Sequence, residues 1–269
     1  MARAKNADKE PEYLSTLERG LSVLRAFDQS RPEMQLSEVA AVTNLNPAVA
    51  RRCLNTLVKL GYVAKHGRKF LLRPEVLAFG WSYISSMNLE TVALPFLQTV
   101  RDETGDSSSM AVLSGHDVLY VAHVSTLRPI RLSANVGTRF PAHATSLGKV
   151  MLAFQGEEAI EKFLATPLAR YTARTITAPE ALRDTLAEVR ENGFASALDE
   201  LDYGIVSVAT PVFDRERRIV AAINCSTSTT RISLEELVRA HVPVLRRASS
   251  EIQAAIARHP YISHSLSGD

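Results

Sequence analysis

The segment from Val39 to Pro74 contains no Asp or Glu, although it carries seven positive charges. These charges belong to Arg51, Arg52, Lys59, Lys65, Arg68, Lys69 and Arg73. A run of one charge sign most often marks an ordinary solvated surface. A surface that binds nucleic-acid phosphates also gathers cations and excludes acids, because carboxylates repel phosphate. The local pattern of the same segment distinguishes these two interpretations.

Local signals before and within this segment predict helices. Leucines recur mostly at helical spacing over Leu14–Phe27, and Ser15 with Glu18 three residues later forms a capping-box pattern. A second helix is predicted over Leu36–Thr43, with Ser37 as its cap.

The third predicted helix lies inside the acid-free segment. Asn46 is a favoured N-cap, Pro47 is tolerated at the first helical position, and Gly61 supplies a left-handed stop. At about 100° per residue, one side is apolar and predicted to be buried: Val49, Cys53, Leu57 and Leu60. The opposite side presents the candidate DNA-contacting residues Pro47, Ala48, Arg51, Arg52, Asn55 and Lys59.

Side chains of these types can recognise and hold DNA. Arg pairs with guanine edges, Asn pairs with adenine edges, and Ala can approach a thymine methyl group. After the third helix, two short extended runs predict a hairpin with a basic tip, to which Lys65, Arg68 and Lys69 belong. Three helices and a basic hairpin predict a winged helix-turn-helix over residues 14–73, with double-stranded DNA as its partner. A protein-interaction module of the same shape is the alternative.

The charge balance changes along the chain. Residues 1–73 hold 13 Lys and Arg against 7 Asp and Glu, whereas residues 74–269 hold 18 against 22. Hydrophobic residues make up 46% of the 269 residues, which is enough for a substantial core. A basic first quarter and an acidic remainder indicate two domains with different partners.

Membrane and secretory classes are disfavoured. No run of about 18 apolar residues occurs, so no membrane-spanning helix is predicted. Residues 1–13 lack the apolar core of a secretory signal and are expected to form a disordered arm. Cys53 and Cys225 lie far apart, which argues against a disulfide framework. A cytoplasmic location is therefore expected.

Several motifs resemble one known family. The runs TLERGLSVLRAF, LSEVAAVTNL and AVARRCLNTLVKLGYV, followed by VGTRFPAHATSLGKVMLA, DELDYGIVSVATPVFD and IVAAINCSTSTTRIS, occur in that order. Together they resemble the IclR family of bacterial transcriptional regulators over roughly residues 14–259. Within the family, RRCLNTL and GTRFPAHATSLGKV most resemble regulators of the β-ketoadipate pathway, which control degradation of protocatechuate, 4-hydroxybenzoate and related compounds.

The remaining residues predict an α+β fold. Residues 74–88 are expected to form a linker helix that also contacts a second subunit, with Trp81 in a core. Residues 89–262 combine helical patterns with strand patterns, which predicts helices and one sheet. The predicted helices are 89–104, 146–154, 157–165, 182–191 and 234–259, and the predicted strands are 108–115, 117–124, 129–136, 205–213 and 219–227. The resemblance implies a GAF-like effector-binding domain here, and residues 263–269 are expected to form a disordered tail.

Enzyme signatures are incomplete. Ser146 and Lys149 match S-x-x-K, but the partner motifs S-D-N and K-T-G are absent. No spacing supports a triad of Cys225, His143 and Asp199, and the seven histidines lack metal-ligand spacing. The chain is therefore predicted to be no enzyme, with no catalytic residue, no metal and no cofactor.

A ligand site is predicted where a polar loop enters the helix that starts near Ser146. Backbone N–H groups at such a start favour an anion, and Arg139 or Arg131 could clamp a carboxylate. The resemblance implies that this loop and the strands opposite it line the effector pocket. The candidate effector-binding residues are Arg139, His143, Ala144, Thr145, Ser146, Ser207, Asn224 and Ser226. Alternatively, these hydroxyls satisfy local backbone groups.

The resemblance has one departure. Some relatives carry a cysteine where this chain has Ser207, and the acidic run here reads DELDY over residues 199–203. Ligand size and charge therefore do not transfer from a single relative. The sequence predicts a DNA-binding regulator that acts as a dimer or dimer of dimers and responds to a small aromatic or dicarboxylic acid. A regulator of another small-acid pathway, a ligand-independent binding module, and an enzyme with an appended winged domain are the alternatives.

Overall fold

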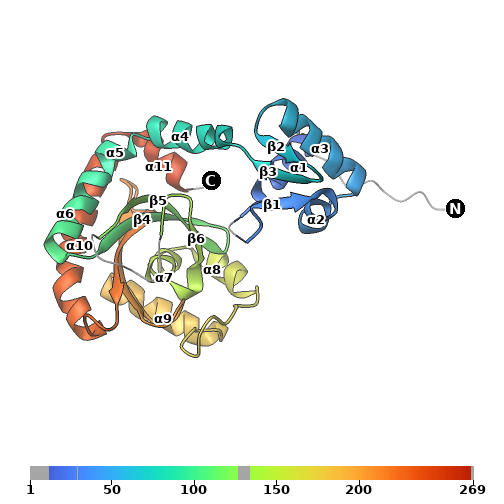
Figure 1. The fold of residues 1–269 in the computed structure, drawn as a ribbon. Helices are drawn as coiled ribbons and strands as arrows, with labels where there is room; N and C mark the ends of the chain where they lie inside the picture. Colours follow the sequence, from blue (N-terminus) through green and yellow to red (C-terminus); the bar gives the residue numbers. More distant parts are fainter. Residues whose placement is uncertain (1–11, 29, 127–133, 268–269) are drawn as a thin grey trace. The chain divides into compact units, whose positions relative to one another are not determined.

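The computed structural model describes residues 12–28, 30–126 and 134–267. The chain separates into two compact units, Met1–Ser82 and Tyr83–Asp269 (Figure 1). The first unit is a winged helix and the second is an α/β domain, so the predicted α+β class is confirmed.

The first unit packs helices against a small sheet. Its elements are α1 (Ser15–Arg25), β1 (Glu33–Gln35), α2 (Leu36–Val42), α3 (Pro47–Lys59), β2 (Val63–His66) and β3 (Lys69–Leu72). The antiparallel strands lie in the order β1-β3-β2. The core includes Val23, Met34, Val39, Leu54 and Phe70. The strand β1 is too short for a periodic signal and was not predicted.

The caps of the first two helices differ from the prediction. Leu14 is the N-cap of α1 and makes no side-chain cap bond, so Ser15 lies inside the helix. In α2 the cap is Gln35, whose backbone N–H donates to Glu38 Oε2 at 2.6 Å. The predicted cap Ser37 was therefore wrong, because the capping box of Gln35 and Glu38 places the start of the helix two residues earlier.

The third helix follows its local signals closely. Asn46 Oδ1 accepts a hydrogen bond from the Ala48 amide at 2.9 Å, and Gly61 adopts a φ of 87° just after the helix. The buried residues of α3 are Ala50, Cys53, Leu54 and Leu57. Leu60 is 61% exposed and was wrongly assigned to the buried side. The buried side of α3 is therefore rotated by about one residue position relative to the predicted buried side.

The predicted linker helix begins as a 3-10 turn, η1 (Pro74–Val76), and continues as α4 (Leu77–Ser86). None of the residues of α4, all of which are described, is fully buried. Trp81 is 61% exposed, so its predicted place in a core was wrong. The two apolar faces of α4 are thus incompletely covered within a single chain.

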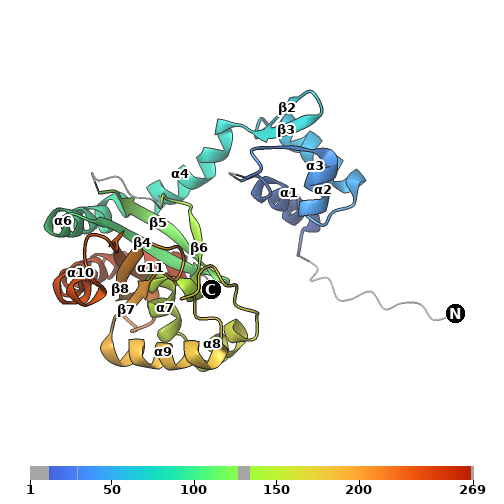
Figure 2. The ribbon, with the colours of Figure 1, turned by 60° about the horizontal axis from the view of Figure 1, so that its bottom comes forward.

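The second unit is built on one antiparallel sheet of six strands (Figures 1 and 2). Its strands are β4 (Ser107–Ser114), β5 (Asp117–Val124), β6 (Arg139–Pro141), β7 (Ala195–Leu198), β8 (Ile205–Phe213) and β9 (Ile219–Ser228), in the order β6-β5-β4-β9-β8-β7. Its helices are α5 (Leu89–Val92), α6 (Leu94–Thr104), η2 (Ala142–Ala144), α7 (Ser146–Ala153), α8 (Glu157–Leu164), α9 (Pro179–Asn192), α10 (Leu234–Ile256) and α11 (Pro260–Ser267).

Helices cover both faces of this sheet and produce two cores. One core joins the sheet to α6, α10 and α11, and the other joins it to α7, α8 and α9 (Figure 2). Successive strand residues point to opposite faces. Val206 and Val208 enter the first core, so Ser207 between them faces the α7 side. The alternation therefore places Ser207 under α7, whereas Thr210 lies on the other face and its hydroxyl bonds to that of Ser249 in α10.

Three other elements differ from the sequence patterns. The helix predicted over 89–104 is interrupted at Ala93, and the strand predicted over 129–136 lies partly outside the described residues. Residues 263–267, predicted to be a disordered tail, belong to α11. Ile262 and Leu266 of α11 are 0% and 3% exposed, so burial of these side chains orders the segment. No helix among the described residues is long and apolar enough to cross a membrane.

Candidate functional site

The predicted DNA-contacting residues of α3 share one exposed side of the helix. Pro47, Ala48, Arg51, Arg52, Asn55 and Lys59 are all exposed. They lie opposite the buried residues, so α3 presents cations and an amide outward. Within the described ranges, none of the cations on α3 forms an ion pair. These charges therefore remain available to an external anion.

The wing carries the other predicted contacts. Lys65 lies on β2, Arg68 lies in the turn and Lys69 begins β3, with Gly67 at a φ of 62°. Lys69 forms an ion pair with Glu33 of β1, and this contact raises the pKa of Lys69. Lys65 and Arg68 have no acidic partner in the described part of the chain. Lys65 and Arg68 are thus better placed than Lys69 to hold a phosphate.

An apolar groove of about 720 Å³ lies beside α3, bordered by α1 and the start of α4. Its lining includes Leu14, Leu17, Leu21, Val49, Leu60, Tyr62 and Phe79. Leu14 and Leu17 of α1 are 71% and 59% exposed. The Tyr62 and Phe79 rings stack with centroids 5.2 Å apart. Several leucines that predict α1 therefore line an open groove rather than the core.

A second, polar pocket lies between the η2–α7 turn and the sheet of the second unit. It is lined by Tyr120, Ala144, Thr145, Ser146, Ala197, Glu200, Leu201, Ile205, Ser207, Asn224 and Ser226. Six of the eight predicted effector-binding residues are in this lining. The free space is about 30 Å³, far below the roughly 300–1,000 Å³ of pockets that hold drug-sized ligands.

Two predicted effector-binding residues point elsewhere. Arg139 is bonded to the Ser114 hydroxyl at 3.0 Å and lies 3.7 Å from the Asp117 carboxylate. His143 is buried and its Nε2 lies 2.9 Å from the Ala169 carbonyl oxygen. Neither is among the described residues that line the pocket. Arg131, the other predicted clamp, lies outside the described residues.

Several hydroxyl groups lie at the N-terminus of α7, where this helix borders the pocket. Thr145 caps the helix by accepting a hydrogen bond from the Gly148 amide at 3.1 Å. The Ser146 and Ser207 hydroxyl oxygens lie 2.8 Å apart and join α7 to β8. On the next strand, Ser226 pairs in register with Ser207. The pocket therefore has three serine hydroxyls on adjoining elements.

A buried ion pair between Lys149 and Glu200 lies on another side of the pocket. Lys149 Nζ donates to Glu200 Oε1 at 2.5 Å, and Lys149 is 2% exposed. Burial lowers the pKa of Lys149, and the Glu200 carboxylate offsets only part of that effect. Lys149 thus pairs with Glu200 rather than activating Ser146, so the S-x-x-K match does not form a nucleophile and base.

Sequence reasoning missed Tyr120, Ala197, Glu200, Leu201 and Ile205. The acidic run over 199–203 was a visible signal, but its partner Lys149 lies far away in sequence. Two threonines hold the segment that contains Asp199 and Glu200 through hydrogen bonds to its backbone carbonyls. Thr175 donates to the Glu200 carbonyl at 2.7 Å, and Thr172 donates to the Asp199 carbonyl at 2.5 Å.

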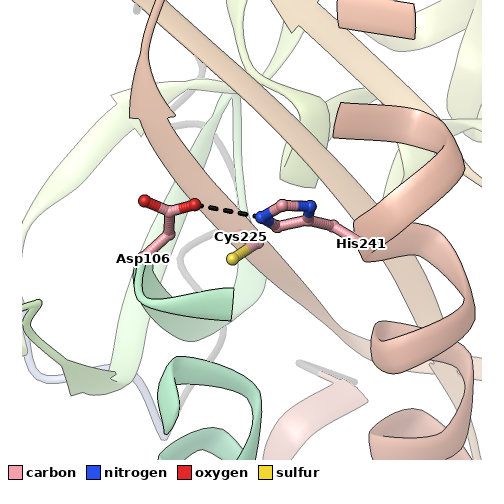
Figure 3. A group of neighbouring side chains, drawn as sticks. All are labelled: Asp106, Cys225 and His241. Atoms are coloured by element: carbon pink, nitrogen blue, oxygen red, sulfur yellow. Dashed lines mark hydrogen bonds and ion pairs between the residues drawn. The ribbon is translucent and has the colours of Figure 1, made fainter. Parts of the chain in front are cut away.

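A different group of titratable residues lies near the end of α6. Asp106, Cys225 and His241 hold potential metal-ligand atoms within 4.8 Å of one another (Figure 3). Asp106 Oδ2 lies 3.0 Å from His241 Nε2 and also pairs with the Arg231 guanidinium. Burial raises the pKa of Cys225 to about 12. Arg231 thus supplies the cation beside Asp106, and the group ties β9 and α10 together as a structural network.

Comparisons with known proteins agree with this two-part architecture. The model "IclR helix-turn-helix domain" matches residues 16–67, and the model "Bacterial transcriptional regulator IclR C-terminal" matches residues 81–254. The "Pca regulon regulatory protein" of Pseudomonas putida is 35% identical over 245 residues, covering 90% of this chain and 84% of that protein.

The descriptions of two further similar proteins include an aromatic acid. The "p-hydroxybenzoate hydroxylase transcriptional activator" of Acinetobacter baylyi is 34% identical over 251 residues, covering 90% of this chain and 92% of that protein. A crystal structure of an IclR homologue from Microbacterium hydrocarbonoxydans, complexed with 4-hydroxybenzoate, is 27% identical with a TM-score of 0.75. It covers 90% of this chain and 99% of its own. The chain belongs to the IclR family of bacterial transcriptional regulators and is not an enzyme.

Proposed function

We propose that this regulator controls genes for the breakdown of aromatic compounds and responds to a small aromatic or dicarboxylic acid in the pocket beneath α7. The observation that carries the proposal is the polar pocket, which has hydroxyl groups and the start of α7 on its walls. The names of the two regulators and the bound acid in the third relative support the choice of ligand.

The DNA-binding step follows from the exposed side of α3. In a winged helix, the third helix enters the major groove and the wing contacts the backbone or minor groove. Arg51, Arg52 and Asn55 then face base edges. Lys65 and Arg68 lie on the wing and contact phosphates.

Asn55→Ala is expected to weaken operator binding by about 1–3 kcal/mol, because an amide that pairs with a base edge is lost. The same change should relax base preference at one position of the site. Fluorescence anisotropy with operator fragments that differ at single base pairs measures both effects. Arg68→Ala is the matched control and should weaken binding to all fragments about equally, with the salt slope reduced by about 1. Equal loss on every fragment with Asn55→Ala would contradict its assignment.

The groove beside α3 supports assembly of the chain with a second copy. Exposed apolar patches of this kind mark interaction sites. A dimer would also match an operator with two half-sites. We propose that two copies bury this groove against each other, with Leu17 and Leu60 inside the contact.

Leu17→Glu is expected to weaken this assembly, because a carboxylate would be buried without a partner. Sedimentation velocity should show a shift toward the smaller species, and operator affinity should fall with it. Val42→Glu, which changes a 42% exposed residue of α2 outside the groove, serves as the control. An unchanged sedimentation profile for Leu17→Glu would exclude the groove as the contact between copies.

Ligand and DNA binding are coupled through the pocket wall. A ring-sized acid does not fit the present free space, so binding requires the wall to move. A coupling of about 1–3 kcal/mol changes operator affinity by roughly 5- to 150-fold.

A thermal-shift series with protocatechuate, 4-hydroxybenzoate, β-ketoadipate and muconate, and with simple keto acids as unrelated acids, tests the proposal. An acid at about 100 times its dissociation constant should stabilise the folded chain by roughly 2.7 kcal/mol. Stabilisation by unrelated small acids alone would favour a regulator of another pathway. No stabilisation by any small acid would favour a ligand-independent DNA-binding module.

A further inference from the structure

The effector pocket contains two buried acceptors that lack a hydrogen-bond donor. Three buried side-chain atoms in the described part of the chain have no partner, and two of them, Glu200 Oε2 and Asn224 Oδ1, belong to residues that line this pocket. Glu200 is 8% exposed and Asn224 is 4% exposed. Because buried polar atoms are nearly always bonded, these two acceptors point to a ligand that brings donors.

The Glu200 carboxylate is held in place by contacts that leave Oε2 available. Its other oxygen accepts from Lys149, and its backbone carbonyl accepts from Thr175. Lys149 is not among the described residues that line the pocket. A ligand on this side therefore meets the carboxylate and not the ammonium group.

At the N-terminus of α7, by contrast, the pocket offers hydrogen-bond donors, which suit a negatively charged group of the ligand. Ser146, Ser207 and Ser226 bring hydroxyl donors, and the first N–H groups of a helix attract an anion. These groups suit the carboxylate of an acid. The pocket thus favours a ligand that has a carboxylate near the start of α7 and a hydrogen-bond donor near Glu200.

Building on the proposed function, we propose that Glu200 selects the effector. Its Oε2 accepts a hydrogen bond from the ring hydroxyl of a hydroxylated aromatic monocarboxylate. A second carboxylate in the place of that hydroxyl would meet the negative charge of Glu200 and be repelled. Of the two acid classes considered above, the aromatic hydroxy acid fits and the dicarboxylate does not.

Isothermal titration of the full chain with matched ligands tests this selection. The ligands are 4-hydroxybenzoate, protocatechuate, benzoate, which lacks the hydroxyl, and terephthalate, which replaces it with a carboxylate. A hydrogen bond to a charged group is lost with benzoate, so its affinity should be about ten- to a hundredfold lower. Terephthalate should bind more weakly still. Terephthalate or benzoate binding as tightly as the hydroxy acids would overturn the inference and leave a small-acid regulator standing.

Variants at Glu200 give a second, independent readout. Glu200→Gln keeps the shape and removes the charge, and Lys149→Met/Glu200→Gln removes the buried charge pair together and so protects folding. In either variant that melts cooperatively, the preference for 4-hydroxybenzoate over terephthalate should fall at least about tenfold. An unchanged preference would overturn the role of Glu200. If the wild-type chain binds none of the four acids, the role of Glu200 is overturned, and the proposed function stands or falls with binding of β-ketoadipate or muconate.

Discussion

Gly148→Ala is expected to unfold or severely distort the pocket beneath α7. A Cβ at this position would lie 2.1 Å from the Ala142 carbonyl oxygen and 2.3 Å from the Ala142 Cα. Both atoms belong to the backbone of η2, so no side-chain rotation relieves the contact. The turn that carries Thr145 and Ser146 would have to move.

The expected loss is about 3 kcal/mol or more, at the upper end for overpacked cores. For a unit of this size, the melting temperature should fall by on the order of 10 °C. Differential scanning calorimetry measures the fall, and titration with acid measures the lost response. Gly156→Ala is the control, because a Cβ there meets no atom within 4 Å and the residue is exposed. Equal melting temperatures for both variants would contradict the close approach of η2 to α7.

Lys149→Met is expected to destabilise the second unit by about 3–5 kcal/mol, because it leaves the Glu200 carboxylate buried without its cation. The pair is 3% and 10% exposed at its side chains. A charge in such surroundings has little water to replace the lost partner. Urea unfolding followed by circular dichroism gives the change in the free energy of unfolding.

Two further variants test whether the loss of stability in Lys149→Met comes from the unpaired buried charge rather than from the loss of a cation alone. Lys149→Met/Glu200→Gln removes both charges and should be less destabilised than Lys149→Met alone. Arg183→Met removes a partly exposed cation that pairs with the exposed acids Glu157 and Glu161, and should cost about 0–1 kcal/mol. Equal losses for Lys149→Met and Arg183→Met would show that the buried pair contributes no more than a surface pair.

The features of the winged unit that depend on neighbouring residues were predictable. Asn46, Pro47 and Gly61 define α3 through contacts within a few positions, and the structure follows them. The groove was not predictable in the same way. The spacing of Leu14 and Leu17 predicts a helix, but spacing alone does not distinguish a residue that faces the core from one that lines an exposed groove.

The pocket was predictable only where polar residues interrupt apolar strands. Ser207 and Asn224 stand out for that reason. Arg139 was misplaced because the pairing of β6 with β5, which sets Arg139 opposite Leu119, has no local signal. Glu200 was missed because its partner Lys149 lies 51 positions away. Contacts of that kind depend on the packing of distant elements.

The most direct test of the central claim is selection of genomic DNA fragments from the source organism by the purified chain, with and without 4-hydroxybenzoate or protocatechuate. We predict enrichment of fragments next to genes for enzymes that hydroxylate or cleave aromatic rings. We also predict that the acid changes their recovery by roughly 5- to 150-fold. Enrichment of fragments without such neighbours, or recovery that no aromatic acid alters, would contradict an aromatic-acid-responsive regulator.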